Sequence, residues 1–237
     1  KKTVTFEKNV EFEMSHLVDL LGEAEVFNQL TTKERAELSR LAVRRSLKKG
    51  DVLSHQGDDW PYVLYIASGA LRSVINSPDG RSYVVSLWEK GAIFWAHTVF
   101  DQKPMPSTLE AARATHLYQW NGEEVLQIVL RNQAATRALL RRQTSLIRKR
   151  RENIYNLAFN PVASRLAKLI IEKFIASDAP TVQRDLTLND MAEMVATSPE
   201  VVCRLLYQFQ DAGAIVVNRA SITLQDRNAL ESLIVEN

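Results

Sequence analysis

Two charged side chains near the end of the sequence have the types and the spacing to read nucleic acid bases. Glu200 and Arg204 lie four residues apart, so a helix would place both on one face. An arginine guanidinium there donates a pair of hydrogen bonds to guanine, and a glutamate carboxylate accepts one from cytosine. Cys203 precedes the arginine and adds its thiol to the same face. The pattern predicts a base-reading surface formed by these three residues.

The sequence around this surface predicts two short helices joined by a tight turn. Thr187 stands three residues before Asp190, the arrangement of a helix cap with an acid in the first turn. Ser198 is a second cap, because Pro199 follows it at the first helical position. Backbone amides at such helix starts bind phosphates. We therefore expect phosphate contacts at Thr187, Asn189 and Ser198.

A hairpin pattern follows the second helix. Residues 214–226 alternate between apolar and polar around a turn at Asn218–Ser221. Helix, helix and hairpin is the order of a winged helix-turn-helix, whose second helix enters the major groove of DNA. Net charge does not support this assignment, because residues 160–237 hold seven basic and ten acidic residues. A helix pair that contacts only proteins is the alternative.

A long helix is predicted over residues 122–159, where no proline or glycine interrupts the helix formers after position 122. Between Arg131 and Arg151 it carries eight basic residues and no acid. Apolar residues recur at intervals of seven at Leu140, Ile147 and Ile154, and the offset series is Thr136, Gln143, Arg150 and Leu157. Such a stripe packs on its own chain or, as we favour, forms the seam of a parallel dimer. Asn160-Pro161 ends the helix.

Upstream, the sequence predicts an antiparallel β-roll between about Lys49 and Trp120. Short β-rich runs cover 63–68, 70–75, 82–88 and 115–120, and glycine-containing turns separate them. The stretch from about Ser15 to Leu41 is helical in pattern, with a capped start at residues 30–34. The predicted fold class is α+β: an antiparallel β-roll domain (1–121), a dimerisation helix (122–159) and a winged helix-turn-helix domain (160–237).

Composition excludes several classes of function. The chain has 237 residues, 46% hydrophobic and 24% charged, as expected of a globular protein. Its start lacks the apolar core of a signal peptide and no apolar run could span a membrane, so we expect a cytoplasmic protein without membrane contact. A single cysteine allows neither an internal disulfide nor a four-thiolate iron-sulfur cluster. No motif for catalysis is evident, so no enzyme is predicted.

From about Leu30 to Leu224 the chain resembles the superfamily of the cAMP receptor protein and FNR, which are bacterial transcription regulators. The matching stretches are LKKGDVLSHQGD, YVLYIASGALRSVI, NLAFNPVASRLAKLI and the helix-turn-helix ending in QDAGAI. The resemblance implies a β-roll sensor, a homodimer joined by the long helix, a palindromic double-stranded DNA operator and RNA polymerase as a further partner.

The predicted recognition helix resembles the FNR subgroup, whose pattern is glutamate, two apolar or small residues, serine and arginine. Here Glu200 and Arg204 match, and Cys203 replaces the serine. The cAMP receptor protein has an arginine where this chain has Pro199. The resemblance implies a half-site related to TTG or TGA, with a different readout of its outermost base pair.

The resemblance also bears on the effector. Cyclic nucleotide-binding members have a glutamate where Ala96 stands, and an Arg-Ser pair where Pro106-Ser107 stands. Without that arginine a buried phosphate has no partner, so cAMP is not expected as the effector.

Haem is a candidate cofactor, because the segment FWAHT resembles the haem-ligating segment of the carbon-monoxide-sensing branch. His97 matches that branch's histidine ligand, and Trp95 stands in place of its cysteine. His16, His55 and His116 show no metal-ligand spacing, so no other metal site is predicted. The sequence also leaves open a small ligand near the aromatic residues 88–95, an effector-independent regulator and a redox switch at Cys203.

Overall fold

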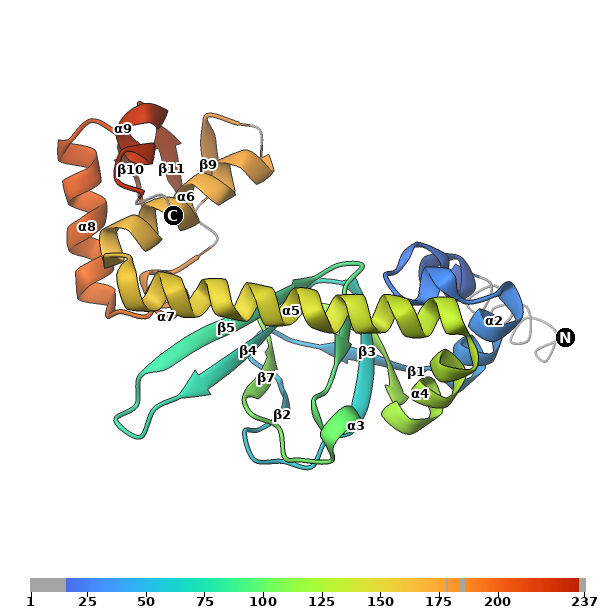
Figure 1. The fold of residues 1–237 in the computed structure, drawn as a ribbon. Coiled ribbons are helices and arrows are strands. Elements are labelled where there is room, and N and C mark those ends of the chain that lie inside the picture. The colour runs from blue at the N-terminus through green and yellow to red at the C-terminus, as the bar shows by residue number, and fades with distance from the viewer. Residues whose placement is uncertain (1–15, 178, 184–185, 235–237) are drawn as a thin grey trace, which may run out of the picture. The chain divides into compact units, whose positions relative to one another are not determined.

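The computed structural model describes residues 16–177, 179–183 and 186–234 (Figure 1). The chain forms two compact units. The first contains the described residues up to Ile75 together with Val85–Ile147, and the second contains Asn76–Val84 and the described residues from Arg148 onward. The opening stretch in which we expected no signal peptide lies outside the described residues. The predicted domain limits at 121 and 159 stay predictions.

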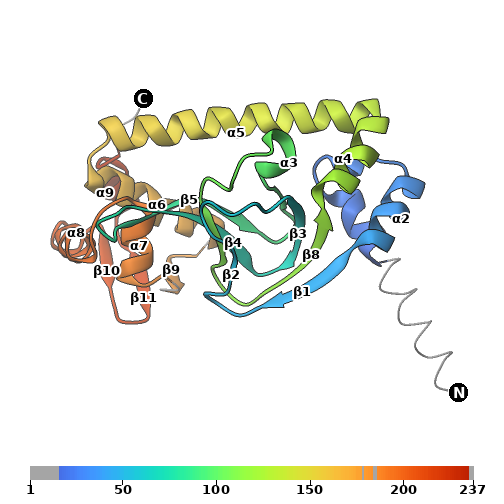
Figure 2. The same ribbon diagram turned by 90° about the horizontal axis from the view of Figure 1, so that it is seen from below.

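Two four-stranded sheets form most of the described part of the first unit, which confirms the predicted β-roll (Figure 2). One sheet has the order β1 (Val43–Leu47), β8 (Thr115–Asn121), β3 (Tyr62–Ser68) and β6 (Ile93–Trp95). The other has the order β2 (Val52–Ser54), β7 (Thr108–Ala111), β4 (Ala70–Asn76) and β5 (Ser82–Glu89). Sequence reasoning found β3, β4, β5 and β8, whereas the other four strands are too short or too polar to show a β pattern.

Alternation along the strands gives the first sheet two buried faces. Leu64 and Ile66 of β3 belong to the cluster between the sheets, whereas Val63 and Tyr65 belong to a cluster shared with the helices. The tight turn between β3 and β4 depends on Gly69, which has a φ of +89°. A Cβ at that position would lie 2.3 Å from the carbonyl oxygen of Ala114, so a larger residue does not fit.

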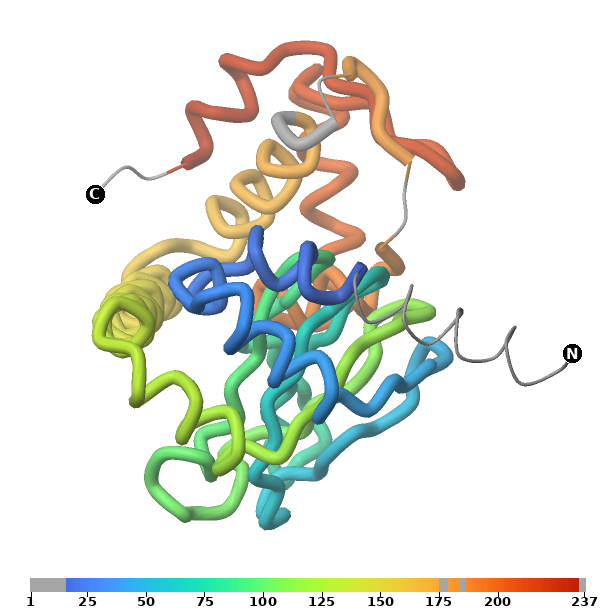
Figure 3. The backbone as a smooth tube through the Cα atoms, turned by 90° about the vertical axis from the view of Figure 1, so that its right-hand side faces the viewer, coloured from blue at the N-terminus to red at the C-terminus, as the bar shows by residue number. Residues whose placement is uncertain are grey.

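The N-terminal helical region is three pieces rather than one continuous stretch. A helix covers residues 16–23, η1 covers Phe27–Gln29 and α2 covers Thr32–Leu41. The capped start of α2 is confirmed: the Thr31 side chain accepts from the Glu34 amide at 3.2 Å, and the Glu34 carboxylate accepts from the Thr31 amide at 2.7 Å. Figure 3 looks along the longest helix, α5, and shows these blue pieces beside it.

The prediction of one helix over residues 122–159 was wrong. The structure has α4 (Gly122–Arg131) and α5 (Gln133–Phe159), with Asn132 between them. The Asn132 side chain accepts from the Ala135 amide at 3.1 Å and donates to Glu34 at 3.0 Å and to the Gln29 carbonyl at 3.2 Å. Local helix propensity alone would continue the helix through Asn132. The helix ends there because this side chain caps α5 and binds a distant segment.

One arginine joins α5 to the sheet. The Arg142 side chain is only 13% exposed, and its guanidinium pairs with Glu25 and donates to the backbone carbonyl of Ile93 in β6. On the same side of α5, Ala135 and Leu139 are buried in the core shared with the helices. The N-terminal half of α5 is therefore fixed to the roll.

From Arg148 onward the second unit contains the end of α5, a helical core and a small sheet. Its helices are α6 (Val162–Ser177), α7 (Leu188–Met194), α8 (Pro199–Asp211) and α9 (Arg227–Glu231), and its strands are β9 (Thr181–Gln183), β10 (Ile215–Val217) and β11 (Ser221–Leu224). The strand β9 pairs with β11 and widens the predicted hairpin to three strands.

Across residues 16–234, apart from the positions left undescribed, no helix combines the length and the apolarity needed to cross a membrane.

Candidate nucleic-acid interface

The helix α8 separates an apolar face from a polar one. Its inward side chains are buried in the core of the second unit, and they are Val202, Leu205, Leu206 and Phe209. On the opposite face Glu200 and Arg204 are exposed, and Cys203 is half-buried between the two faces. Tyr207 is 59% exposed and extends the polar face by one turn. The structure thus brings the three predicted base-reading residues onto one accessible surface.

The helix α7 begins with the cap predicted from its sequence. The Thr187 side chain accepts from the Asp190 amide at 3.1 Å, and the Asp190 carboxylate accepts from the Thr187 amide at 2.9 Å. At the other end Ala196 adopts a φ of +52°, and the Thr197 amide donates to the Ala192 carbonyl at 2.9 Å. This left-handed residue reverses the chain within the few residues that separate α7 from α8.

The predicted side-chain cap at Ser198 is not formed. Ser198 occupies the N-cap position of α8, but its side chain makes no capping hydrogen bond there. Its hydroxyl instead donates to the Glu200 carboxylate and is the main cause that lowers the pKa of that group. A lowered pKa keeps Glu200 ionised, and an ionised carboxylate is an acceptor only, as cytosine recognition requires.

A side chain of α8 binds the hairpin formed by β10 and β11, which is the wing of the helix-turn-helix. The Gln210 amide oxygen accepts from the Val217 amide of β10 at 2.9 Å, and the hairpin turn closes where the Asn218 amide donates to the Ser221 carbonyl at 2.9 Å. Arg219 is exposed at the tip of this turn. Sequence reasoning identified the turn but gave Arg219 no role, although a cation at a hairpin tip was a usable signal.

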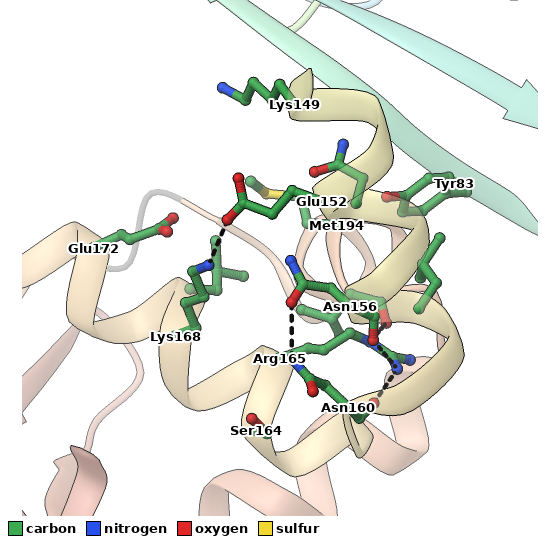
Figure 4. Close-up of a pocket in the computed structure, with 14 residues that line it drawn as sticks. Tyr83, Lys149, Glu152, Asn156, Asn160, Ser164, Arg165, Lys168, Glu172 and Met194 are labelled. Carbon is green, nitrogen blue, oxygen red and sulfur yellow. Dashed lines mark hydrogen bonds and ion pairs between the residues drawn. The ribbon is translucent and has the colours of Figure 1, made fainter. Parts of the chain in front are cut away.

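A second arginine missed by sequence reasoning joins three helices within the second unit (Figure 4). Arg165 of α6 donates to the Asn160 carbonyl at 2.6 Å, to the Asn156 carbonyl at 3.5 Å and to the Val195 carbonyl at 3.1 Å. Asn156 and Asn160 lie at the end of α5, and Val195 follows α7. Burial lowers the pKa of Arg165. One guanidinium therefore binds carbonyls at the ends of two helices.

A polar cavity of about 260 Å³ opens beside this junction (Figure 4). Its wall includes the ion pair of Lys168 with Glu152, at 3.4 Å. Tyr83 also lines the cavity and lies beside α5, and burial raises its pKa although the charges of Arg150 and Arg165 act in the opposite direction.

The predicted seam of α5 is exposed along its length. Leu140, Ile147 and Ile154 have exposed fractions of 62%, 69% and 67%. These exposed fractions are high for large aliphatic side chains in a helix whose other face is buried. The three side chains form a regular stripe along α5.

The candidate effector residues lie in different environments. His97 is exposed at the start of α3 (Thr98–Asp101), whereas Trp95 is 7% exposed and packs against Phe27 with ring centroids 6.0 Å apart. The indole N–H of Trp95 is buried without a hydrogen-bond partner, but it is a donor and provides no metal-ligand atom. The pair therefore offers haem one imidazole.

Two of the residues at the nucleotide-cassette positions are buried, whereas two of the other histidines are exposed. Ala96 is fully buried and Ser107 is 6% exposed. His16 and His55 are exposed, and His116 accepts from or donates to the Ser46 hydroxyl at 2.8 Å. No group of three or more metal-ligating side chains occurs in the described part of the chain.

Two protein families match the chain in the order of its two units. The cyclic nucleotide-binding domain matches residues 44–132, and the Crp-like helix-turn-helix domain matches residues 163–233. The chain belongs to the CRP/FNR family of transcription regulators. Its matched segments contain the β-roll and the helices α7 and α8 described above.

Several known proteins resemble the chain over most of its length. The CRP-like cAMP-activated global transcriptional regulator of Mycobacterium tuberculosis is 22% identical over 90% of this chain and 97% of its own. The anaerobic regulatory protein of Haemophilus influenzae is 24% identical over 88% of this chain and 83% of its own. The structure of FixK2 from Bradyrhizobium japonicum has the same fold, with a TM-score of 0.72, 19% identity and coverage of 83% and 98%.

Replacing Arg165 tests the helix junction. Arg165→Ala removes the donor of three carbonyl groups and should lower the local stability of α7 and of the end of α5 by about 2 kcal/mol. Hydrogen exchange of the amides in these segments measures the change. Lys168→Ala, one turn further along α6, breaks only an exposed ion pair and should leave exchange nearly unchanged. Equal exchange in both variants would remove Arg165 from this role.

Proposed function

We propose that this transcription regulator is a homodimer that binds a palindromic DNA site through α8 and responds to an effector held in the β-roll. The observation that carries the proposal is the polar face of α8, where Glu200 and Arg204 are exposed while the opposite face is buried. A buried face fixes the helix, and fixed exposed side chains are what base recognition requires.

In this proposal Arg204 contacts a guanine and Glu200 contacts a cytosine of each half-site. Cys203 lies between them and makes a weaker contact, because a thiol is a poor hydrogen-bond donor. Pro199 has no side-chain donor, so the outermost base pair of a half-site related to TTG or TGA is read differently from that of the cAMP receptor protein. Each good base contact contributes roughly 1–3 kcal/mol of discrimination.

Phosphate contacts offset the acidic balance of residues 160–237. We assign them to the start of α7, at Thr187 and Asn189, and to the start of α8, at Ser198. All three are exposed. The Asn189 amide group donates to Glu193 at 2.9 Å, which holds this side chain at the start of the helix. Helix starts carry partial positive charge, so they bind phosphates even where few cations are present.

The dimer forms along α5. Its exposed stripe has the seven-residue spacing of a parallel two-helix seam, and its other face is already covered by the roll. A parallel arrangement relates the two recognition helices by a two-fold axis, which requires half-sites about one helical turn, or roughly 34 Å, apart. RNA polymerase is the expected further partner of such a regulator.

The effector proposed for the roll is a small molecule other than a cyclic nucleotide. Ala96 and Pro106 provide neither of the charged groups that would hold a cyclic phosphate, and an unpaired buried phosphate is costly. The cAMP named for the Mycobacterium tuberculosis regulator therefore does not carry over to this chain. Haem is a second candidate, because the His97 imidazole is exposed and imidazole is an ordinary axial ligand.

The base contacts are tested by substitution in α8. Arg204→Ala should weaken binding to the protein's own palindrome by about 10- to 100-fold, measured by fluorescence anisotropy. Gln208→Ala, one turn further along the exposed face, is the matched control and should have a small effect.

The phosphate contacts are tested by salt. The affinity of the unaltered protein for DNA should fall by about 10³ to 10⁵ between 50 and 200 mM salt. A flat salt response would favour contact with proteins only.

The seam is tested by a charge within it. Ile147→Asp should convert the dimer to a monomer in light scattering, because two carboxylates would face each other in an apolar contact. Ser145→Asp places the same charge on an exposed position of the same helix and should leave the dimer intact. A dimer that persists in Ile147→Asp contradicts the proposed seam.

Haem is tested by absorption between 350 and 600 nm after addition of haemin. If His97 ligates the iron, His97→Ala shifts the Soret band, whereas His55→Ala, which alters another exposed histidine of the roll, does not. The same spectrum in the wild type and in His97→Ala would exclude His97 as the ligand.

A further inference from the structure

Two rows of polar side chains line the cavity beside the junction of α5 and α6. Along the end of α5 the polar residues recur at intervals of four, and along α6 they do so again. An interval of four keeps side chains on one side of a helix. The members of the two rows are Glu152, Asn156 and Asn160 at the end of α5 and Ser164, Lys168 and Glu172 on α6 (Figure 4). Two walls of the cavity therefore consist of groups that form hydrogen bonds.

One buried acceptor in these walls has no partner. Asn160 is only 9% exposed, and its side-chain nitrogen donates to the Asn156 side-chain oxygen at 2.8 Å. The side-chain oxygen of Asn160, Oδ1, is buried and accepts no hydrogen bond within the described part of the chain. A buried acceptor without a donor is costly, so native proteins usually satisfy it with another group. Because Asn160 lines the cavity, a molecule held there can supply the missing donor.

The charges around the cavity are balanced. Lys168 and Glu152 pair with each other at 3.4 Å, and the Arg165 guanidinium donates to three backbone carbonyls. The other two charged residues of the wall are of opposite sign, Lys149 and Glu172. A wall that carries both signs favours neither an anion nor a cation. Its donors and acceptors instead match hydroxyl groups, which donate and accept hydrogen bonds at once.

The size and the apolar parts of the cavity fit a compact ring. Its volume of about 260 Å³ is below the roughly 300–1,000 Å³ of sites that hold drug-sized ligands, so the ligand is small. The aromatic ring of Tyr83 and the side chain of Leu157 add apolar surface to the polar walls. A ring with hydroxyl groups at its edge and C–H groups on its faces uses both kinds of surface.

We propose that this cavity binds a compact, neutral, polyhydroxylated ring of the monosaccharide or cyclic polyol class, and that one hydroxyl group of this ligand donates to Asn160 Oδ1. Met194 and Val195, at the end of α7, also line the cavity, so the ligand bridges the same three helices that Arg165 joins. Every residue that lines the cavity belongs to the second unit. The site is therefore separate from the effector site proposed for the roll.

The experiment is isothermal titration calorimetry of the full chain without DNA, with D-glucose, D-galactose and myo-inositol as separate probes. At least one probe should bind with a dissociation constant at or below about 1 mM, as expected for about twelve non-hydrogen atoms that form several hydrogen bonds. The same probe should raise the melting temperature of the chain, because it binds only the folded state. The absence of saturable binding by all three probes overturns the proposal.

Substitutions in the walls locate the binding. Asn160→Ala removes the unpartnered acceptor and should weaken binding of the probe by about 3- to 10-fold. Lys168→Ala breaks only an exposed ion pair, should have an effect of similar size, and tests the same cavity if Asn160→Ala does not fold. Asn228→Ala, the matched control, changes an exposed asparagine of α9 in the same unit and should leave binding unchanged. Circular dichroism establishes that each variant is folded.

Three further ligands test the chemical class. L-serine is a zwitterion, inorganic phosphate is an anion and cAMP is a cyclic nucleotide, and none of them should bind in the cavity. If one of them binds in place of the neutral probes, and the two wall substitutions weaken that binding, the ligand is not a neutral polyol. A neutral probe that binds equally well to both folded wall variants occupies another site and contradicts the proposal. These outcomes leave the proposed base contacts of α8 untouched, because the titrations contain no DNA.

Discussion

The rest of the structure depends on α5, because this helix has two apolar faces and both need something to pack against. One face of this 27-residue helix is buried against the roll through Ala135 and Leu139, and another carries an exposed aliphatic stripe. A helix with a single apolar face would be complete within one chain. Because α5 is not, its remaining stripe is available for the dimer contact proposed above, and its C-terminal end leads directly into the helix junction that supports α7 and α8.

Local signals predicted the parts of the fold in which neighbouring residues settle the structure. The caps at Thr31 and Thr187 are complete within four residues, and both form as expected. The apolar face of α8 follows from helical spacing, so its exposed face was also predictable. The longer strands of the roll show clear alternation and glycine turns, which is why β3, β4, β5 and β8 were found.

Long-range contacts explain what the sequence could not show. Asn132 ends α4 because its side chain binds Glu34, almost a hundred residues earlier, and no local pattern contains that information. The strand β9 has three residues and exists because β11 pairs with it. Arg165 looks like any helix-surface arginine until the ends of α5 and α7 meet it. Ser198 shows the reverse case, since a good capping residue bonds to a neighbouring carboxylate instead.

The attachment at Arg142 divides α5 into a shorter N-terminal part and a longer C-terminal part. This arginine is bound to the Ile93 carbonyl in β6, four residues before His97, and it stands seventeen residues before the end of the helix at Phe159. At 1.5 Å per residue the stretch from Arg142 to Phe159 is about 26 Å long, so a tilt of about 5° at Arg142 moves its end by about 2 Å.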